Sequence, residues 1–245
     1  MLKEPNKVID SLIKEKYKEA KAVFWAGSVS KNDGTSASDL DLVIVYESIP
    51  TAYREAFIYD TWPIDAFVHD INTLQYFFEE SRVGNGISGL MNMIINGIIV
   101  TEPSTFSDDI KTLAQEILNV GPIPLTQDQI DKERFLITDI LDDIKFPRNK
   151  NEQIASAVHL FEPLIQFYFR AQKKWSGSGK ALMRLFKLEN PYLAQEWNKA
   201  FETLVKVGDA SGIETVVTKI LIEYGGLLWD GFRSYSSSVA SKKNF

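Results

Sequence analysis

The sequence predicts an α+β protein in which a small mixed β-sheet is followed by an antiparallel helical bundle. In the first half, short β-branched runs alternate with helical patterns, whereas the second half shows helical periodicity with short polar breaks. Gly121-Pro122-Ile123-Pro124 separates the halves, because two prolines around one residue interrupt both helix and sheet. We therefore expect one domain over residues 1–120 and a second over residues 121–245.

Composition places the chain among ordinary folded proteins, with 44% hydrophobic and 24% charged residues in a length of 245. No run approaches the about 20 apolar residues that span a bilayer, and the first ten residues lack the apolar core of a signal peptide. We expect a cytoplasmic protein without a membrane partner. The absence of cysteine leaves oxygen and imidazole as the available metal ligands.

The charge is acidic and unevenly distributed. The net charge of −6 argues against a large nucleic-acid footprint, since neutralising phosphates requires a basic face. Residues 1–120 carry 10 Lys/Arg against 18 Asp/Glu (−8), while residues 121–245 carry 17 against 15 (+2). No long nucleic acid is expected as a partner, and the acidic balance suits a cationic small molecule.

In the first half, each element follows from a local pattern. Ile9, Leu12 and Ile13 recur at helical spacing, and the continuous β-branched run at 40–46 predicts a central strand. The other expected elements are strands at 22–26, 57–59, 63–69 and 98–100, and helices at 51–56, 72–82, 86–96 and 108–119, with a turn at 60–62.

The second half begins with a helix that Thr126 caps, with Gln129 three residues later as in a capping box. This helix should run to about Lys145. Further helices are expected at 152–174, 180–188, 191–207 and 213–229, followed by a frayed tail at 234–245.

Acidic residues gather at the start of the central strand. Residues two apart in a strand project to the same face, so Asp39 and Asp41 direct both carboxylates into one small volume. Two carboxylates that close repel each other unless a cation lies between them, and Mg²⁺ or Mn²⁺ suits such oxygen ligands. Asp65, in the strand at 63–69, is the third acid, and three acids can hold two divalent cations.

Gly27-Ser28 ends the preceding strand and predicts a phosphate cradle. The glycine allows close backbone approach, and the serine offers an N–H and a hydroxyl to phosphate oxygens. We expect a helix to begin just after Ser28, with its positive end directed at the same phosphates. Lys31 is an additional candidate phosphate contact.

This constellation resembles the minimal nucleotidyltransferases of the DNA polymerase β superfamily. The resemblance rests on Gly27-Ser28, ten intervening residues, Asp39-Leu40-Asp41, and Asp65 on a later strand. A sheet domain followed by a helical bundle is similar to the kanamycin and lincosamide nucleotidyltransferases. The resemblance implies that Gly27 and Ser28 contact the triphosphate, that Asp39 and Asp41 bind the metals, and that Asp65 completes the catalytic site. Family members often carry a basic residue and a glycine soon after Gly-Ser, whereas the loop at 29–35 is more polar.

The expected activity is transfer of an NMP group from an NTP·Mg²⁺ complex to a hydroxyl of an aminoglycoside-like acceptor, with release of pyrophosphate. Two alternatives stay open: addition of AMP to a protein partner, and a nucleotide-binding scaffold without turnover. A homodimer formed through the exposed helical surface is also open.

Four residues outside the motif are secondary candidates. Lys174 and Lys180, in the lysine-rich segment 173–180, could reach the triphosphate, although a solvated helix–helix turn explains them equally well. The segment is not a P-loop, because the required spacing and preceding strand are absent. By resemblance, Glu162 could serve as a general base. His69 shares a strand face with Asp65, but packing is the favoured explanation.

Overall fold

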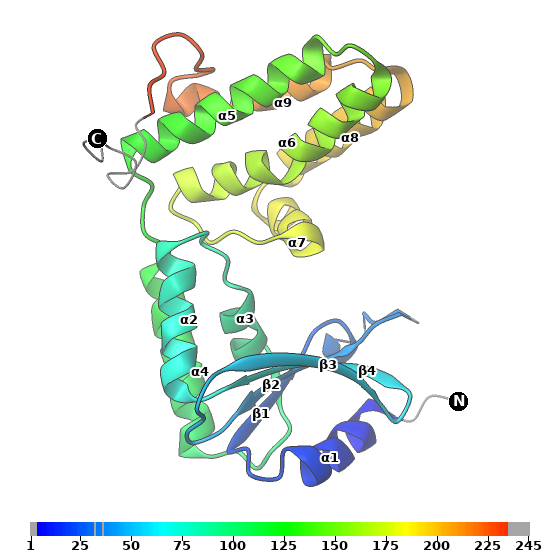
Figure 1. Cartoon of the computed structure of the whole chain (residues 1–245), viewed down its shortest axis with the longest axis vertical. Coiled ribbons are helices and arrows are strands. Elements are labelled where there is room, and N and C mark those ends of the chain that lie inside the picture. The colour runs from blue at the N-terminus through cyan, green and yellow to red at the C-terminus, as the bar shows by residue number, and fades with distance from the viewer. Residues whose placement is uncertain (1–3, 32, 36, 235–245) are drawn as a thin grey trace, which may run out of the picture. The chain divides into compact units, whose positions relative to one another are not determined.

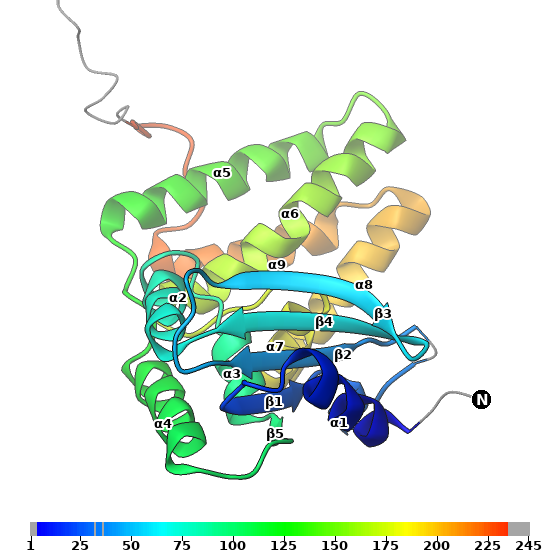
Figure 2. The same ribbon diagram turned by 60° about the horizontal axis from the view of Figure 1, so that its bottom comes forward.

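The computed structural model describes residues 4–31, 33–35 and 37–234 (Figures 1 and 2). It shows a mixed α+β fold, a five-stranded sheet followed by a helical region, which confirms the predicted fold class. The chain divides into two compact units, residues 1–123 and 124–245. All but the first residue of the tail expected to fray lies outside the described residues. None of the described helices combines the length and apolar character needed to cross a membrane.

The sheet unit has strand order β3-β4-β2-β1-β5, in which β2 and β4 are parallel and the other neighbours are antiparallel. Its elements are α1 (Pro5–Lys16), β1 (Ala22–Ala26), the 3-10 helix η1 (Val29–Lys31), β2 (Leu40–Val45), β3 (Tyr53–Tyr59), β4 (Trp62–His69), α2 (Ile71–Val83), α3 (Gly89–Ile95), β5 (Ile98–Ile99) and α4 (Thr105–Val120).

Helices cover both faces of this sheet. Helix α1 lies across one face and packs its apolar side against alternate residues of the strands, including Leu40, Leu42 and Ile44 of β2 (Figures 1 and 2). On the other face α3 packs against β1 and α2 against β4. Because side chains alternate along a strand, Asp41 and Asp65 belong to the face opposite α1.

The structure corrects the helix expected at residues 51–56, where β3 runs instead. Residues 51–56 include Arg, Glu and Ala, which favour helices. The strand β3, however, pairs with β4 over its whole length, from Tyr53↔Val68 to Tyr59↔Trp62. The hairpin turns at Asp60 and Thr61, whose φ angles of 49° and 73° suit a two-residue connection. Strand pairing within the hairpin therefore overrides the helical propensity of the segment.

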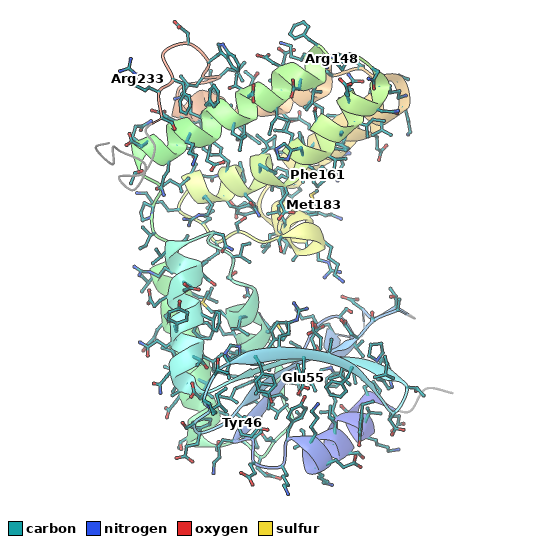
Figure 3. All side chains as sticks on the ribbon, in the orientation of Figure 1. Tyr46, Glu55, Arg148, Phe161, Met183 and Arg233 are labelled. Carbon is teal, nitrogen blue, oxygen red and sulfur yellow. The ribbon has the colours of Figure 1, made fainter. Side chains whose placement is uncertain are left out.

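The second unit is helical throughout its regular elements. These are α5 (Gln127–Lys145), α6 (Lys150–Ala171), α7 (Gly179–Glu189), α8 (Pro191–Val207), α9 (Ser211–Leu221) and the 3-10 helix η2 (Ile222–Tyr224). The predicted capping box is confirmed: the Thr126 hydroxyl accepts from the backbone N–H of Gln129, whose side chain accepts from the backbone N–H of Thr126. Phe161 belongs to the aromatic part of the core, against Trp197 and Phe201 (Figure 3).

The last helix ends earlier than expected. It was predicted over 213–229, but α9 stops at Leu221 and only the short η2 continues to Tyr224. Gly225 and Gly226 then adopt φ angles of 104° and 75°, which leave the right-handed helical region. Residues 227–234 therefore follow a non-helical path.

Candidate metal and phosphate site

Three acidic side chains converge at the start of the two parallel strands. Asp41 on β2 is paired in register with Asp65 on β4, and Asp39 directly precedes the first residue of β2. One carboxylate oxygen from each of the three lies within 4.8 Å of the others. Asp65 is 7% exposed, and the other two are half-buried. The structure thus brings together all three acids that the sequence singled out.

The chemistry of this cluster fits a hard divalent cation. Carboxylate oxygens are the ligands that Mg²⁺ and Mn²⁺ prefer, and such ions keep water and substrate oxygens in their remaining positions. The three carboxylates lie at the edge of an apolar core, where like charges repel more strongly than in water. A cation among them would relieve that repulsion.

Gly27 lies directly against one of these acids. It follows β1, whose last residue Ala26 is paired with Asp41, and it adopts a φ angle of 81°. A Cβ atom placed on Gly27 would lie 1.9 Å from Oδ2 of Asp41. No other residue type fits this position without moving the carboxylate, so glycine is required by both the backbone conformation and the space.

The helix expected after Ser28 is reduced to the three-residue η1, so that prediction is wrong. The backbone N–H groups of Lys31 and Asp33 both donate to the carbonyl oxygen of Ser28, at 3.1 and 2.9 Å. The Ser30 hydroxyl donates to the carbonyl oxygen of Gly27. A tight turn therefore replaces a helix N-terminus. Lys31 lies exposed within it, and its contact with phosphate stays a prediction.

Ser38 is a neighbour of the site that was not assigned a role from the sequence. Its hydroxyl oxygen lies 3.2 Å from that of Ser28 and accepts a hydrogen bond from the backbone N–H of Thr35 at 2.8 Å. Ser38 thereby links the two ends of the loop that separates β1 from β2. Its position directly before Asp39 in the motif was the available signal.

Arg54 is the second residue that sequence reasoning missed. Its Nε and Nη2 atoms donate to Oδ1 and Oδ2 of Asp65 at 2.8 and 2.7 Å, and its guanidinium lies 4.7 Å from the centre of the Phe67 ring. The hydrogen bond with Asp65 raises the pKa of Arg54, assisted by the charges of Asp41 and Asp39 against the opposing effect of burial. Counting back from the turn at 60–61 along the hairpin would have placed Arg54 beside Phe67.

His69 has the environment of a packing residue. Burial lowers its pKa to about 4, outweighing the opposing charge of Asp70. Its ring meets the ring of Phe77 edge-on at 5.4 Å, and its Nδ1 atom is buried without a hydrogen-bond partner among the described residues. A neutral, buried imidazole packed on α2 supports the interpretation favoured from the sequence.

The secondary candidates of the helical unit have local partners. Lys174 forms an ion pair with Glu189 and also contacts the side chain of Gln172. Glu162 accepts hydrogen bonds from the side chain of Gln166 at 2.9 Å and from the backbone N–H of Gly179, the first residue of α7, at 3.4 Å. Lys180 is exposed. The roles predicted for these residues in nucleotide binding and catalysis stay predictions.

Comparison with known proteins adds little to this picture. The sequence matches no protein-family model and no curated protein. Among solved structures, it is similar to a nucleotidyltransferase-like protein from Exiguobacterium sibiricum 255-15, with a TM-score of 0.47 and 13% identity, over 91% of this chain and 77% of that one. A likeness this distant carries no functional argument, and the proposal that follows rests on the site itself.

Proposed function

We propose that this chain is a metal-dependent nucleotidyltransferase, which transfers an NMP group from an NTP to a hydroxyl group and releases pyrophosphate. The observation that carries the proposal is the cluster of Asp39, Asp41 and Asp65, whose carboxylate oxygens lie within 4.8 Å of one another beside Gly27. Oxygen ligands at this density, next to a turn rich in hydroxyl and N–H groups, suit a metal-bound triphosphate.

Each residue of the site has a role in this proposal. Asp39, Asp41 and Asp65 would hold one or two Mg²⁺ or Mn²⁺ ions, which when bound neutralise phosphate oxygens and lower the pKa of the attacking hydroxyl. Gly27 and Ser28 would offer backbone and hydroxyl contacts to the triphosphate, with Lys31 nearby in sequence. The acceptor oxygen bonds to the α-phosphorus as the bond to the β-phosphate oxygen breaks. The hydroxyl proton passes to water, and pyrophosphate leaves with the bonding electrons.

We further propose a small cationic acceptor of the aminoglycoside type. The support is electrostatic: residues 1–120 carry 10 Lys/Arg against 18 Asp/Glu. An acidic surface raises the local concentration of polyamine-like compounds and disfavours polynucleotides. Lys174 and Lys180 are proposed as secondary contacts of the triphosphate, and Glu162 as a candidate general base.

The test is transfer of label from each α-labelled NTP in the presence of Mg²⁺ or Mn²⁺, with a panel of aminoglycosides and, separately, a cell lysate. Label on an aminoglycoside supports the full proposal, whereas label on a protein band replaces the small acceptor with a protein. NTP binding without transfer to any acceptor would favour a scaffold without turnover.

A matched pair of variants ties the activity to the site. Asp39→Asn/Asp41→Asn removes two charges from the cluster and should abolish transfer. Asp142→Asn/Asp143→Asn removes two exposed charges from α5 and should leave transfer unchanged. Equal activity in both double variants would rule out the assigned metal site.

A further inference from the structure

Arg54 forms a two-point ion pair with an acid of the proposed metal site although most of the arginine is exposed. Its side chain is 64% exposed, whereas that of Asp65 is 11% exposed. Both carboxylate oxygens of Asp65 accept from the guanidinium, which also lies over the Phe67 ring. An exposed cation therefore covers a nearly buried anion.

Arg54 offsets part of the negative charge of the acid cluster. Three carboxylates within 4.8 Å carry three negative charges when ionised, and one guanidinium offsets a single charge. The guanidinium is the exposed partner of the pair, so on leaving Asp65 it returns to water, and a stronger competitor can take its place. A divalent ion is such a competitor, because it carries twice the charge and binds oxygen directly.

We infer that Arg54 is a displaceable counter-cation, which neutralises Asp65 while the cluster holds no metal and leaves it when a divalent cation binds. The inference rests on the metal site of the proposed function and adds that Arg54 opposes metal binding. An ion that takes Asp65 as a ligand, together with Asp39 and Asp41, competes with the guanidinium for the same two carboxylate oxygens. If Arg54 instead held Asp65 rigidly in position for the metal, its removal would weaken metal binding rather than strengthen it.

Whether Arg54 weakens or strengthens metal binding can be measured without nucleotide or turnover. Mn²⁺ binding to the full chain, followed by the electron paramagnetic resonance signal of free Mn²⁺, should be about two- to five-fold tighter in Arg54→Gln than in the wild type. Arg54→Lys, which keeps the charge but loses the two-point geometry, should be intermediate.

A matched control lies on the other face of the same strand. Lys16, the last residue of α1, forms an ion pair at 2.6 Å with Glu55, outside the acid cluster. Glu55 lies on the α1 side of β3 (Figure 3). Lys16→Gln removes a cation that pairs with an acid of β3, whereas Arg54→Gln removes a cation that β3 itself carries, and Lys16→Gln should leave Mn²⁺ affinity unchanged. An equal increase in Mn²⁺ affinity in Lys16→Gln and Arg54→Gln would show a general charge effect and overturn the inference.

Two further measurements separate displacement from bracing. In an Asp65→Asn background, most of the gain from Arg54→Gln should disappear, because the ion pair no longer exists. In EDTA, Arg54→Gln should unfold at a lower temperature than the wild type, and saturating Mn²⁺ should reduce or reverse the difference. Weaker or unchanged Mn²⁺ binding by Arg54→Gln overturns the inference while the metal site stands.

Failure of the proposed function gives a different result. If neither the wild type nor Arg54→Gln binds Mn²⁺, both the metal site and the displaceable cation are wrong. If the Mn²⁺ pattern appears as expected but no acceptor receives label, transferase activity is wrong while the role of Arg54 stands.

Discussion

Arg54 in the sheet unit and Arg134 in the helical unit each donate several hydrogen bonds, and the two differ in what they bind. Arg134 on α5 is 8% exposed and donates to the backbone carbonyls of Gly225 and Gly226 and to Asp131 on its own helix. Arg54 is largely exposed and binds one of three clustered carboxylates. Arg134 thus fixes the chain after α9, whereas Arg54 offsets part of a local excess of negative charge.

The acids of the two units also differ in their partners. Glu162 accepts from Gln166 and from the N–H at the start of α7, a helix whose Ser178 N-cap makes no side-chain cap hydrogen bond. This is the role of a helix-capping residue. In the sheet unit, by contrast, Asp39, Asp41 and Asp65 meet one another. Convergence of like charges indicates a ligand more strongly than the presence of acids or lysines does.

The largest expected effect comes from removing one acid of the cluster. Asp41→Asn should lower kcat/KM for NMP transfer about a thousand-fold or more, because a lost metal ligand removes several kcal/mol of transition-state stabilisation. Thermal unfolding in EDTA serves as the control: the variant should be no less stable than the wild type, since one like charge is gone. Transfer within ten-fold of wild type would contradict the assignment.

A side chain at Gly27 should damage the site through its backbone. Gly27→Ala combines a φ angle of 81° with a contact of 1.9 Å to Asp41, so we expect a loss of about 2–4 kcal/mol in unfolding free energy and weaker Mn²⁺ binding. Gly231→Ala is the matched control, because Gly231 has a φ angle of 80° and no atom within 4 Å of the added Cβ. It should lose only about 1 kcal/mol and keep Mn²⁺ affinity.

The buried imidazole predicts a pH dependence of stability. His69 has a pKa of about 4 in the folded state, against an ordinary value near 6.5, so the unfolded state binds more protons between these values. The unfolding free energy should therefore fall as the pH is lowered from about 6.5 to 4, by at most about 3 kcal/mol from this group. Urea titrations across that range measure the slope.

Substitution of His69 separates its contribution to the pH dependence of the unfolding free energy from that of the carboxylates. His69→Leu should flatten the slope between pH 6.5 and 4, because the group that the unfolded state protonates is gone. His159→Leu, at an exposed position on α6, should keep the wild-type slope. Identical slopes in all three proteins would show that His69 is not the responsible group.

The smallest expected effect comes from Glu162, and it tests whether the helical unit supplies a catalytic residue. If Glu162 caps α7, Glu162→Gln should cost about 0.5–1 kcal/mol in unfolding free energy and leave kcat within about three-fold. A general base would instead lose about 100-fold in kcat, with a changed pH profile. The second result would assign a catalytic residue to the helical unit and weaken the contrast drawn above.

Local patterns were sufficient for much of the fold and for the acids. The buried β-branched run at 40–46, the capping box at Thr126 and the prolines at 122 and 124 each act over a few residues, so the sequence displays them directly. Asp39 and Asp41 were predicted because a strand imposes a two-residue period on its side chains, and Asp65 because it is an acid inside the apolar strand run at 63–69. The helix expected at 51–56 failed because pairing with β4, which lies farther along the chain, outweighs a weak helical preference.

The sequence by itself determined the fold class and the acids that could form a site, because periodicity and residue chemistry are local properties. Only the tertiary structure decided that β2 and β4 are parallel neighbours and that the turn after Ser28 is too short for a helix dipole. It alone decided that Arg54 reaches Asp65, since that ion pair depends on the register of a hairpin. Pairing between strands depends on contacts beyond the local sequence pattern, and it placed both the acids and the arginine of the site.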